Sequence, residues 1–180
     1  MDPIVKKTLD AMPLVNKPQK VFIGLLLSVL VMFQGKATFR NLSRYSAMSE
    51  KRFSRWYGRS FDFFTFNSLM MSDLLLKKDE LIAALDASFM AKSGKYTDGL
   101  GKFWSGCSGQ AERGLEISLL SVVDLKSNTA YALDVQQTLE QENKTRVDLY
   151  VEQVIALAQQ VINLGIKYLA VDAYYYKQKF

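Results

Sequence analysis

Histidine is absent from this chain of 180 residues, and Cys107 is its only cysteine. These absences exclude a zinc site of the usual Cys/His kind, a disulfide within the chain, a Ser-His-Asp triad and a histidine-based nuclease. Any catalysis must therefore rest on carboxylate, lysine, tyrosine or serine side chains. A single cysteine is also consistent with a reducing cytoplasm, where disulfides are rare.

Long hydrophobic runs are missing as well. The run Val21–Phe33 has 13 residues, whereas about 20 are needed to span the hydrocarbon of a bilayer. It therefore predicts a buried core helix, and we expect neither a membrane partner nor a signal peptide, because the run starts late and no cleavage pattern follows it. All three prolines lie in residues 1–20, which predicts a loose lead-in with a short helix at most.

Positive charge is concentrated in the first part of the chain. Residues 1–79 carry 13 Lys/Arg against 6 Asp/Glu, a net charge of +7, whereas residues 80–180 carry 10 against 12, a net charge of −2. Such asymmetry suggests a polyanion-binding region, and a solvated charged surface is the alternative interpretation. It predicts two regions, a helical basic one over residues 1–79 and a second one over residues 80–180.

Two short helices with exposed cations are predicted after Gly35. The first covers Thr38–Tyr45, and the second runs from about Glu50 to Arg59 behind the N-cap residue Ser49. Phe53, Trp56 and Tyr57 would form the apolar side of the second helix. The outline is that of a helix-turn-helix, whose second helix enters the DNA major groove, although basic amphipathic helices also occur in proteins that do not bind DNA. The candidate DNA-binding residues are Arg40, Arg44, Lys51, Arg52, Arg55 and Arg59.

The aromatic segment Phe61–Phe66 has two interpretations, a stacking surface for bases or, preferably, part of a core or an interdomain seam. The loop lysines Lys92 and Lys95 also have two interpretations of equal weight. They contact substrate phosphates, or they are simply solvated.

From Leu81 the pattern changes to that of a sheet. A first strand over Leu81–Leu85 is predicted to end at Asp86, and a glycine-rich loop follows over residues 92–109. An antiparallel hairpin, a helix that begins at the capping box of Thr145 and Asp148, and a last strand before Asp172 come next. The corresponding strands are Ile117–Val123, Thr129–Val135 and Tyr168–Val171. A right-handed crossover would place the last strand parallel to the first, so the fold class is α/β (α+β overall). A small all-α, helix-turn-helix-like region precedes an incomplete RNase H-like mixed sheet with one helix.

Asp86 and Asp172 are the candidate catalytic and metal-binding residues. In open α/β sheets, sites gather beyond the carboxyl ends of parallel strands, where two carboxylates can hold Mg²⁺ against a phosphate. A single aspartate at a strand end more often caps the next turn. The pair favours the metal site.

Three segments resemble bacterial insertion-sequence transposases of the DDE type: DASFMAKSGK at Asp86–Lys95, GLEISLL at Gly114–Leu120 and LAVDAYYY at Leu169–Tyr176. Phe39–Ser46 and Ser49–Phe53 are similar to the DNA-binding part of these enzymes. The resemblance implies that Asp86 and Asp172 are the first two acids of a triad that holds two Mg²⁺ or Mn²⁺ ions for DNA hydrolysis and strand transfer. It also implies element-end DNA as the partner, no small-molecule cofactor, and a nucleoid-associated place in the bacterial cytoplasm. Self-association is a further expectation, because a partial sheet leaves hydrophobic faces bare.

The third acid of that triad, a glutamate, has no counterpart, because no Asp or Glu follows Asp172 in this sequence. We therefore expect the N-terminal portion of a transposase, truncated and inactive alone, and we leave open whether the chain is an enzyme. The alternative is a non-catalytic DNA-binding protein or regulator derived from a truncated transposase.

Overall fold

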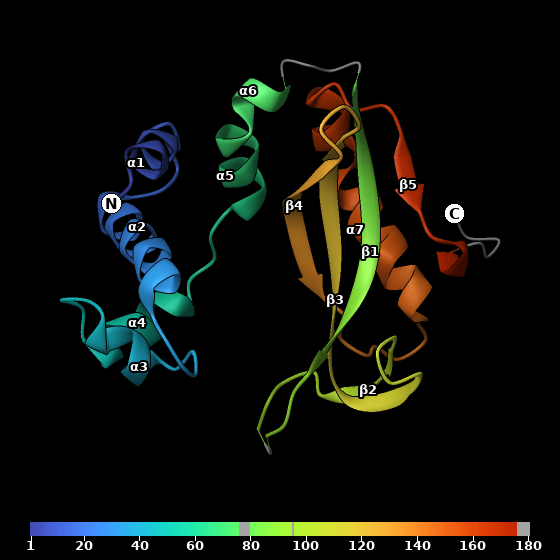
Figure 1. Ribbon diagram of the computed structural model, residues 1–180, viewed down its shortest axis with the longest axis horizontal. Helices are drawn as coiled ribbons and strands as arrows, with labels where there is room; N and C mark the ends of the chain where they lie inside the picture. Colours follow the sequence, from blue (N-terminus) through green and yellow to red (C-terminus); the bar gives the residue numbers. More distant parts are fainter. Residues whose placement is uncertain (76–79, 95, 176–180) are drawn as a thin grey trace. The chain divides into compact units, whose positions relative to one another are not determined.

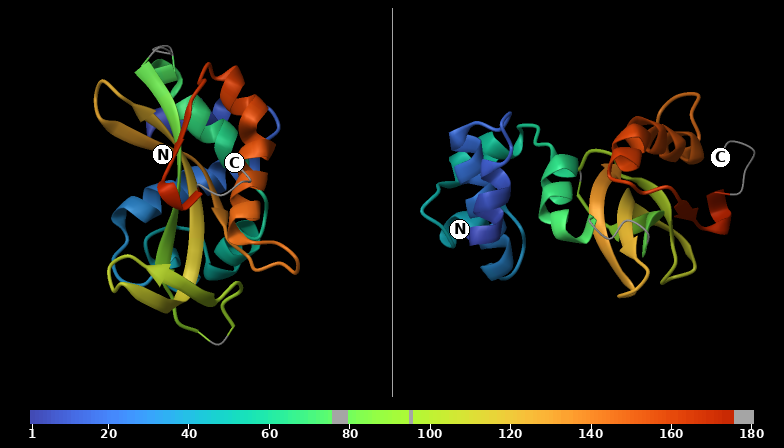
Figure 2. Two further views of the ribbon diagram at one scale, coloured as in Figure 1. Left: turned by 90° about the vertical axis from the view of Figure 1, so that its right-hand side faces the viewer. Right: turned by 90° about the horizontal axis from the view of Figure 1, so that it is seen from above.

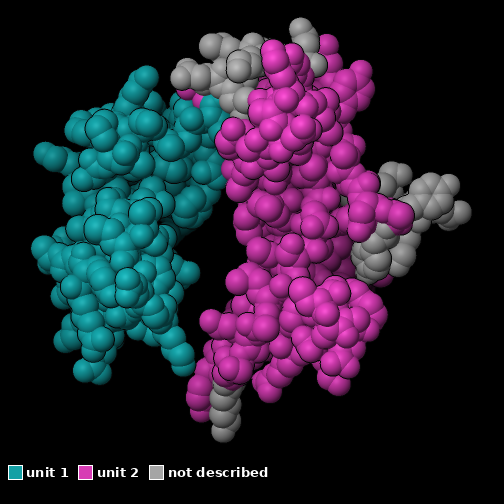
Figure 3. Space-filling view, viewed as in Figure 1, with its two compact units in different colours: residues 1–71 teal, residues 72–180 magenta. Residues whose placement is uncertain are grey.

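The computed structural model describes residues 1–75, 80–94 and 96–175 of the chain. They divide into two compact units, Met1–Met71 and Ser72–Phe180 (Figure 3). Helices make up the first unit, and a mixed sheet with a long helix dominates the second (Figure 1). The chain is therefore an α/β protein, as the sequence predicts.

The first unit contains five described helices around one apolar core. The core is centred on Phe22, Leu42 and Phe53, each no more than 5% exposed. The helices are α1 (Pro3–Asp10), α2 (Lys17–Met32), α3 (Phe39–Arg44), α4 (Glu50–Tyr57) and α5 (Phe63–Met70).

The sequence predicts that residues 1–20 form a loose lead-in with a short helix at most. α1 is that short helix, but the segment is not loose, because Leu9, Met12 and Val15 are buried and α2 already begins at Lys17. Asp2 caps α1 with hydrogen bonds from the backbone N–H groups of Ile4 and Val5, and Asn16 caps α2. Prolines stand in the first turn of both helices, where the missing N–H has no helical partner to lose. The prolines therefore start helices here instead of excluding them.

The apolar run Val21–Phe33 forms most of α2 and supplies buried residues such as Phe22, Ile23 and Val29, as predicted. Over the described ranges, none of the helices combines the length and apolar character needed to cross a membrane.

The second unit is built on a five-stranded sheet. β3 pairs antiparallel with β1, β2 and β4, and β5 pairs parallel with β1. Helix α7 lies on one face of this sheet (Figure 2). The elements are α6 (Ser72–Leu75), β1 (Leu81–Ala91), β2 (Gly101–Ser105), β3 (Gln110–Asp124), β4 (Thr129–Gln137), α7 (Arg146–Asn163), β5 (Leu169–Val171) and the 3-10 turn η2 (Ala173–Tyr175).

The predicted hairpin, capping box and parallel crossover are confirmed. β3 and β4 form the hairpin, and Thr145 and Asp148 exchange both capping hydrogen bonds at the start of α7. The apolar faces of α7 and the sheet bury residues such as Leu85, Leu120 and Val147, each at 2% exposure.

Three predicted boundaries in the sheet are wrong. The strand predicted over Ile117–Val123 is β3, which already begins at Gln110. β1 does not end at Asp86 but continues to Ala91, and the expected loop over residues 92–109 contains strand β2. The changes in β1 and β2 both depend on pairing with the long strand β3, where Asp86 lies opposite Leu119 and Ala91 opposite Gly114. Beyond Asp86 the side chains still alternate between more and less exposed positions, which is the period of a strand.

Candidate functional site

Asp86 and Asp172 follow directly paired residues on two neighbouring parallel strands. Leu85 of β1 lies opposite Val171 of β5, so the next residue on each chain segment is an aspartate. Neighbouring strands lie about 4.8 Å apart, and both aspartates are exposed. The expected adjacency of the two strands is therefore confirmed, and the crossover through α7 is what produces it.

Asp86 lies on the face of the sheet opposite α7. Leu85 is buried against the helix side, and successive side chains of a strand point to opposite faces. Ser88 and Met90 follow Asp86 on this second face and are exposed as well. A ligand that approaches Asp86 therefore meets an open sheet face.

Tyr175 follows Asp172 by three residues and places its side chain in the protein interior. Its backbone N–H donates to the Asp172 carbonyl oxygen at 3.2 Å, and its side chain is 1% exposed. Its ring packs 5.3 Å from that of Tyr150. Burial raises the pKa of the Tyr175 phenol, and the nearby carboxylates of Asp86, Asp172 and Glu116 raise that pKa further. The phenol is therefore neutral at physiological pH and lies in the field of both aspartates.

Glu116 belongs to a buried network on the α7 face. The Tyr150 hydroxyl donates a short hydrogen bond to Glu116 Oε1, and Arg146 Nη1 lies 3.7 Å from Oε2. The Arg146 guanidinium also lies 4.5 Å above the Phe103 ring and donates to the Lys102 carbonyl oxygen at 2.7 Å. Both carboxylate oxygens of Glu116 thus have partners, as a buried charge requires.

Sequence reasoning missed this network, because Glu116 and Tyr150 are 34 positions apart in the chain and no local spacing connects them. Glu116 lies opposite Phe89 in the sheet register, on the face that does not carry Asp86. It is therefore no third ligand for the aspartate pair. Within the described ranges no group of three or more Asp, Glu or Cys side chains is arranged to hold a metal ion.

The cations predicted to bind DNA are exposed. Lys51, Arg52 and Arg55 lie within an arc of about 100° on α4, with buried Phe53 on the opposite side. Arg40 and Arg44 are exposed on α3, and Arg59 lies just past α4.

The helix-turn-helix outline needs two corrections. Ser49 occupies the N-cap position of α4 without a side-chain hydrogen bond. Tyr57, which the sequence predicts on the apolar side of this helix, is the last residue of α4 and is 66% exposed; the centroid of its ring lies 5.3 Å from that of Phe39. Arg59 lies 4.7 Å above the Trp56 ring, so this cation also stabilises the end of the helix.

The remaining predicted residues have different outcomes. Lys92 is exposed directly after β1, and Lys95 lies outside the described residues. In the aromatic segment, Phe66 is 6% exposed and packs 5.7 Å from Phe61, which supports the core interpretation. Asp62 caps α5 through its hydrogen bond from the Thr65 N–H.

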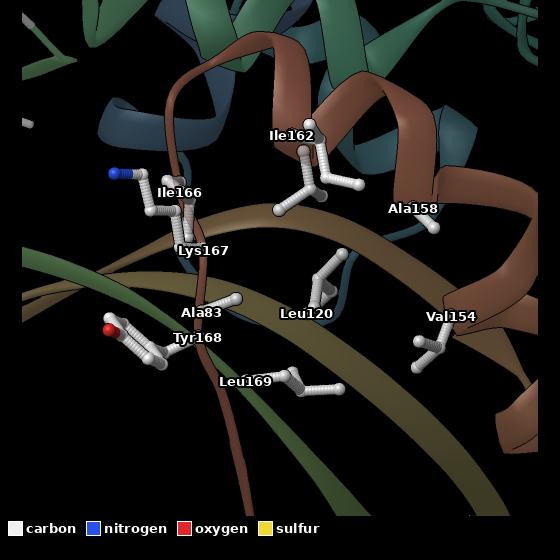
Figure 4. Close-up of a pocket in the computed structure, with 10 residues that line it drawn as sticks. Ala83, Leu120, Val154, Ala158, Ile162, Ile166, Lys167, Tyr168 and Leu169 are labelled. Atoms are coloured by element: carbon white, nitrogen blue, oxygen red, sulfur yellow. The ribbon is translucent and has the colours of Figure 1, made fainter.

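An apolar cavity of about 130 Å³ lies between the sheet and the C-terminal half of α7 (Figure 4). Leu120, Val154 and Ile162 line it from three directions, and its wall includes no carboxylate. It lies on the α7 face of the sheet, whereas Asp86 lies on the opposite face. We interpret it as a packing gap next to the edge strand β5.

Neither a protein-family model nor a curated protein sequence matches this chain.

Proposed function

We propose that this chain is a DNA-processing protein of the DDE-transposase type, in which Asp86 and Asp172 bind Mg²⁺ or Mn²⁺ at a DNA phosphodiester. The observation that carries the proposal is the parallel register of β1 and β5, which sets Leu85 opposite Val171 and so brings the two aspartates together. An RNase H-like arrangement of the sheet belongs to the same proposal.

The donor chemistry fits the metal. Mg²⁺ takes oxygen ligands, keeps several waters, and is often bound by one or two carboxylates together with substrate phosphates. Two exposed carboxylates that follow paired residues of neighbouring parallel strands would supply such a partial shell. When bound, the ions would supply activation of the attacking water or 3′-hydroxyl and stabilisation of the leaving oxygen.

The role of the first unit in the proposal is to bind duplex DNA at the ends of a mobile element. Lys51, Arg52 and Arg55 form one exposed face of α4, suited to phosphates and base edges. The net charge of +7 over residues 1–79 favours this binding, because each phosphate contact releases counterions. Self-association and a nucleoid-associated place in the bacterial cytoplasm belong to the same proposal. The edge strand β5, with Leu169 and Val171 about two-fifths exposed, supports self-association.

A second candidate is a non-catalytic DNA-binding protein or regulator. It is favoured by the lack of a third carboxylate beside the pair within the described ranges. The cations of α4, by contrast, lie together on one exposed face of that helix.

The test is a Mn²⁺ titration of the full chain beside Asp86→Asn and Asp172→Asn. We expect weak binding by the wild type and at least tenfold weaker binding by each variant. Asp98→Asn is the matched control, since Asp98 is an exposed carboxylate of the same unit. Equal Mn²⁺ binding by all four proteins would remove the metal site. If duplex DNA affinity then still fell in Arg52→Ala/Arg55→Ala, the non-catalytic candidate would stand.

A further inference from the structure

The hairpin of β2 with the start of β3 presents two cations and an indole on one face. In its register Lys102 lies opposite Arg113, and Trp104 lies opposite Ala111. Lys102 and Trp104 are two residues apart on one strand, so they point to the same side. We call this set, Lys102, Trp104 and Arg113, the basic-aromatic hairpin.

On the other face of the hairpin, the large side chain is buried in the protein. Phe103 is 1% exposed and lies beneath the Arg146 guanidinium of α7. Trp104, by contrast, is 62% exposed, and Lys102 and Arg113 are exposed beside it. Neither cation has an ion-pair partner among the residues that the structure describes. Packing among the described residues therefore explains Phe103 but does not explain why an indole and two cations lie together on the surface.

The basic-aromatic hairpin shares the sheet face of Asp86. Phe103 faces α7, so Lys102 and Trp104 face away from it, as Asp86 does. The register of β3 agrees, because Arg113 and Leu119 are six residues apart and Leu119 lies opposite Asp86. Six residues of strand span about 20 Å, so the hairpin and Asp86 are within reach of one short nucleic-acid segment.

We propose that the basic-aromatic hairpin binds single-stranded DNA that leads to the Asp86 and Asp172 site. Lys102 and Arg113 neutralise successive phosphates, and Trp104 stacks on an unpaired base. Proteins that bind single strands combine a cationic track with exposed aromatic rings, because an unpaired base offers its own face for stacking. In a duplex that face is already covered by neighbouring base pairs. The inference rests on the proposed function, because the site to which the strand leads is the proposed metal site. What it adds is that this face of the sheet binds an unpaired DNA strand.

The experiment uses the full chain and a twelve-nucleotide oligo(dT) that carries a fluorescent label, with binding followed by anisotropy. Base stacking on an aromatic side chain is worth roughly 5- to 150-fold in affinity, so we expect a loss of that size in Trp104→Ala. Trp104→Phe, which retains an aromatic face, should recover most of the affinity. Lys102→Ala/Arg113→Ala should weaken binding and reduce its salt dependence.

Two controls locate the effect. Lys126→Ala removes an exposed cation from the turn at the far end of the same sheet and should change nothing. In Trp56→Phe, Trp104 is the only tryptophan, and its emission should be quenched by oligo(dT). A duplex of the same length should bind equally well to the wild type and Trp104→Ala.

Unchanged oligo(dT) affinity in Trp104→Ala, or an equal loss for the duplex, would overturn the inference. Such a result together with loss of Mn²⁺ binding in Asp86→Asn would leave the proposed function standing. Conversely, a loss of oligo(dT) affinity in Trp104→Ala with Mn²⁺ binding unchanged in both aspartate variants would support the single-strand surface and refute the proposed function.

Discussion

Replacing Tyr150 with phenylalanine removes one oxygen atom from the interior of the second unit. Tyr150 is 2% exposed, and its hydroxyl donates to Glu116, which is 7% exposed. The phenylalanine ring can keep the contact with Tyr175, so little volume is lost. The main loss is one hydrogen bond to a charged group, which contributes about 1.5–3 kcal/mol.

The cost stays in this range because Glu116 keeps a second partner. Arg146 remains 3.7 Å from its other carboxylate oxygen, so the charge is not left alone. Removing the last partner of a buried ion pair would cost more, about 3–5 kcal/mol. For a domain of this size, a loss of about 2 kcal/mol lowers the midpoint of thermal unfolding by roughly 10 °C.

The assay is urea and thermal unfolding of the full chain, followed at the transition of the second unit. Tyr131→Phe is the control, because Tyr131 is 39% exposed on β4 of the same unit, and its change should stay below about 0.5 kcal/mol. Combining Tyr150→Phe with Glu116→Gln should give a coupling energy above about 0.5 kcal/mol. If Tyr150→Phe costs no more than the control, the Glu116 network does not stabilise the unit in the way argued above.

Two further predictions concern pH and the sheet. Burial raises the pKa of both Tyr150 and Tyr175 above the ordinary value of 10.0, and nearby carboxylates, Glu116 among them, raise both further. The folded chain therefore holds these protons more tightly than the unfolded chain, so the stabilisation is complete below about pH 10 and is lost above it; a urea midpoint that stays constant up to pH 11 would contradict this. Gly114→Ala should destabilise the second unit by about 1–3 kcal/mol, because a Cβ there would lie 2.3 Å from the Met90 carbonyl oxygen. Gly106→Ala, with nothing within 4 Å of its added Cβ, should leave the thermal midpoint nearly unchanged, and equal effects of the two substitutions would refute the steric argument.

Local signals in the sequence predict those elements whose pattern is complete within one segment. The capping box at Thr145 and Asp148, the β3–β4 hairpin and the cations of α4 are of this kind. Strand β2 could not be predicted in this way, because it lies among glycines and the contacts of its buried Phe103 include Arg146, 43 positions later.

The same distinction between local patterns and distant contacts holds for the candidate site. Two apolar runs that each precede an aspartate are enough to predict that the strands before Asp86 and Asp172 are neighbours, since parallel strands joined by one crossover helix become adjacent. The sequence could not indicate that β1 passes through Asp86, because that depends on pairing with β3 as far as Gly114. Nor could it indicate that Glu116 is bound by Tyr150 on the opposite face.

The shortness of β5 has a consequence for how the aspartate pair is held together. Asp86 and Asp172 are 86 positions apart in the chain. Asp172 is held next to β1 by the pairing of β5, which has only three residues. Little structure has to open locally for β5 to leave the edge of the sheet, while the longer β1–β3 ladder of 11 paired residues stays closed. The two carboxylates would then separate without unfolding of the unit. A metal ion or a DNA strand that bridges them would oppose that opening, so ligand binding and the closure of this sheet edge would stabilise each other.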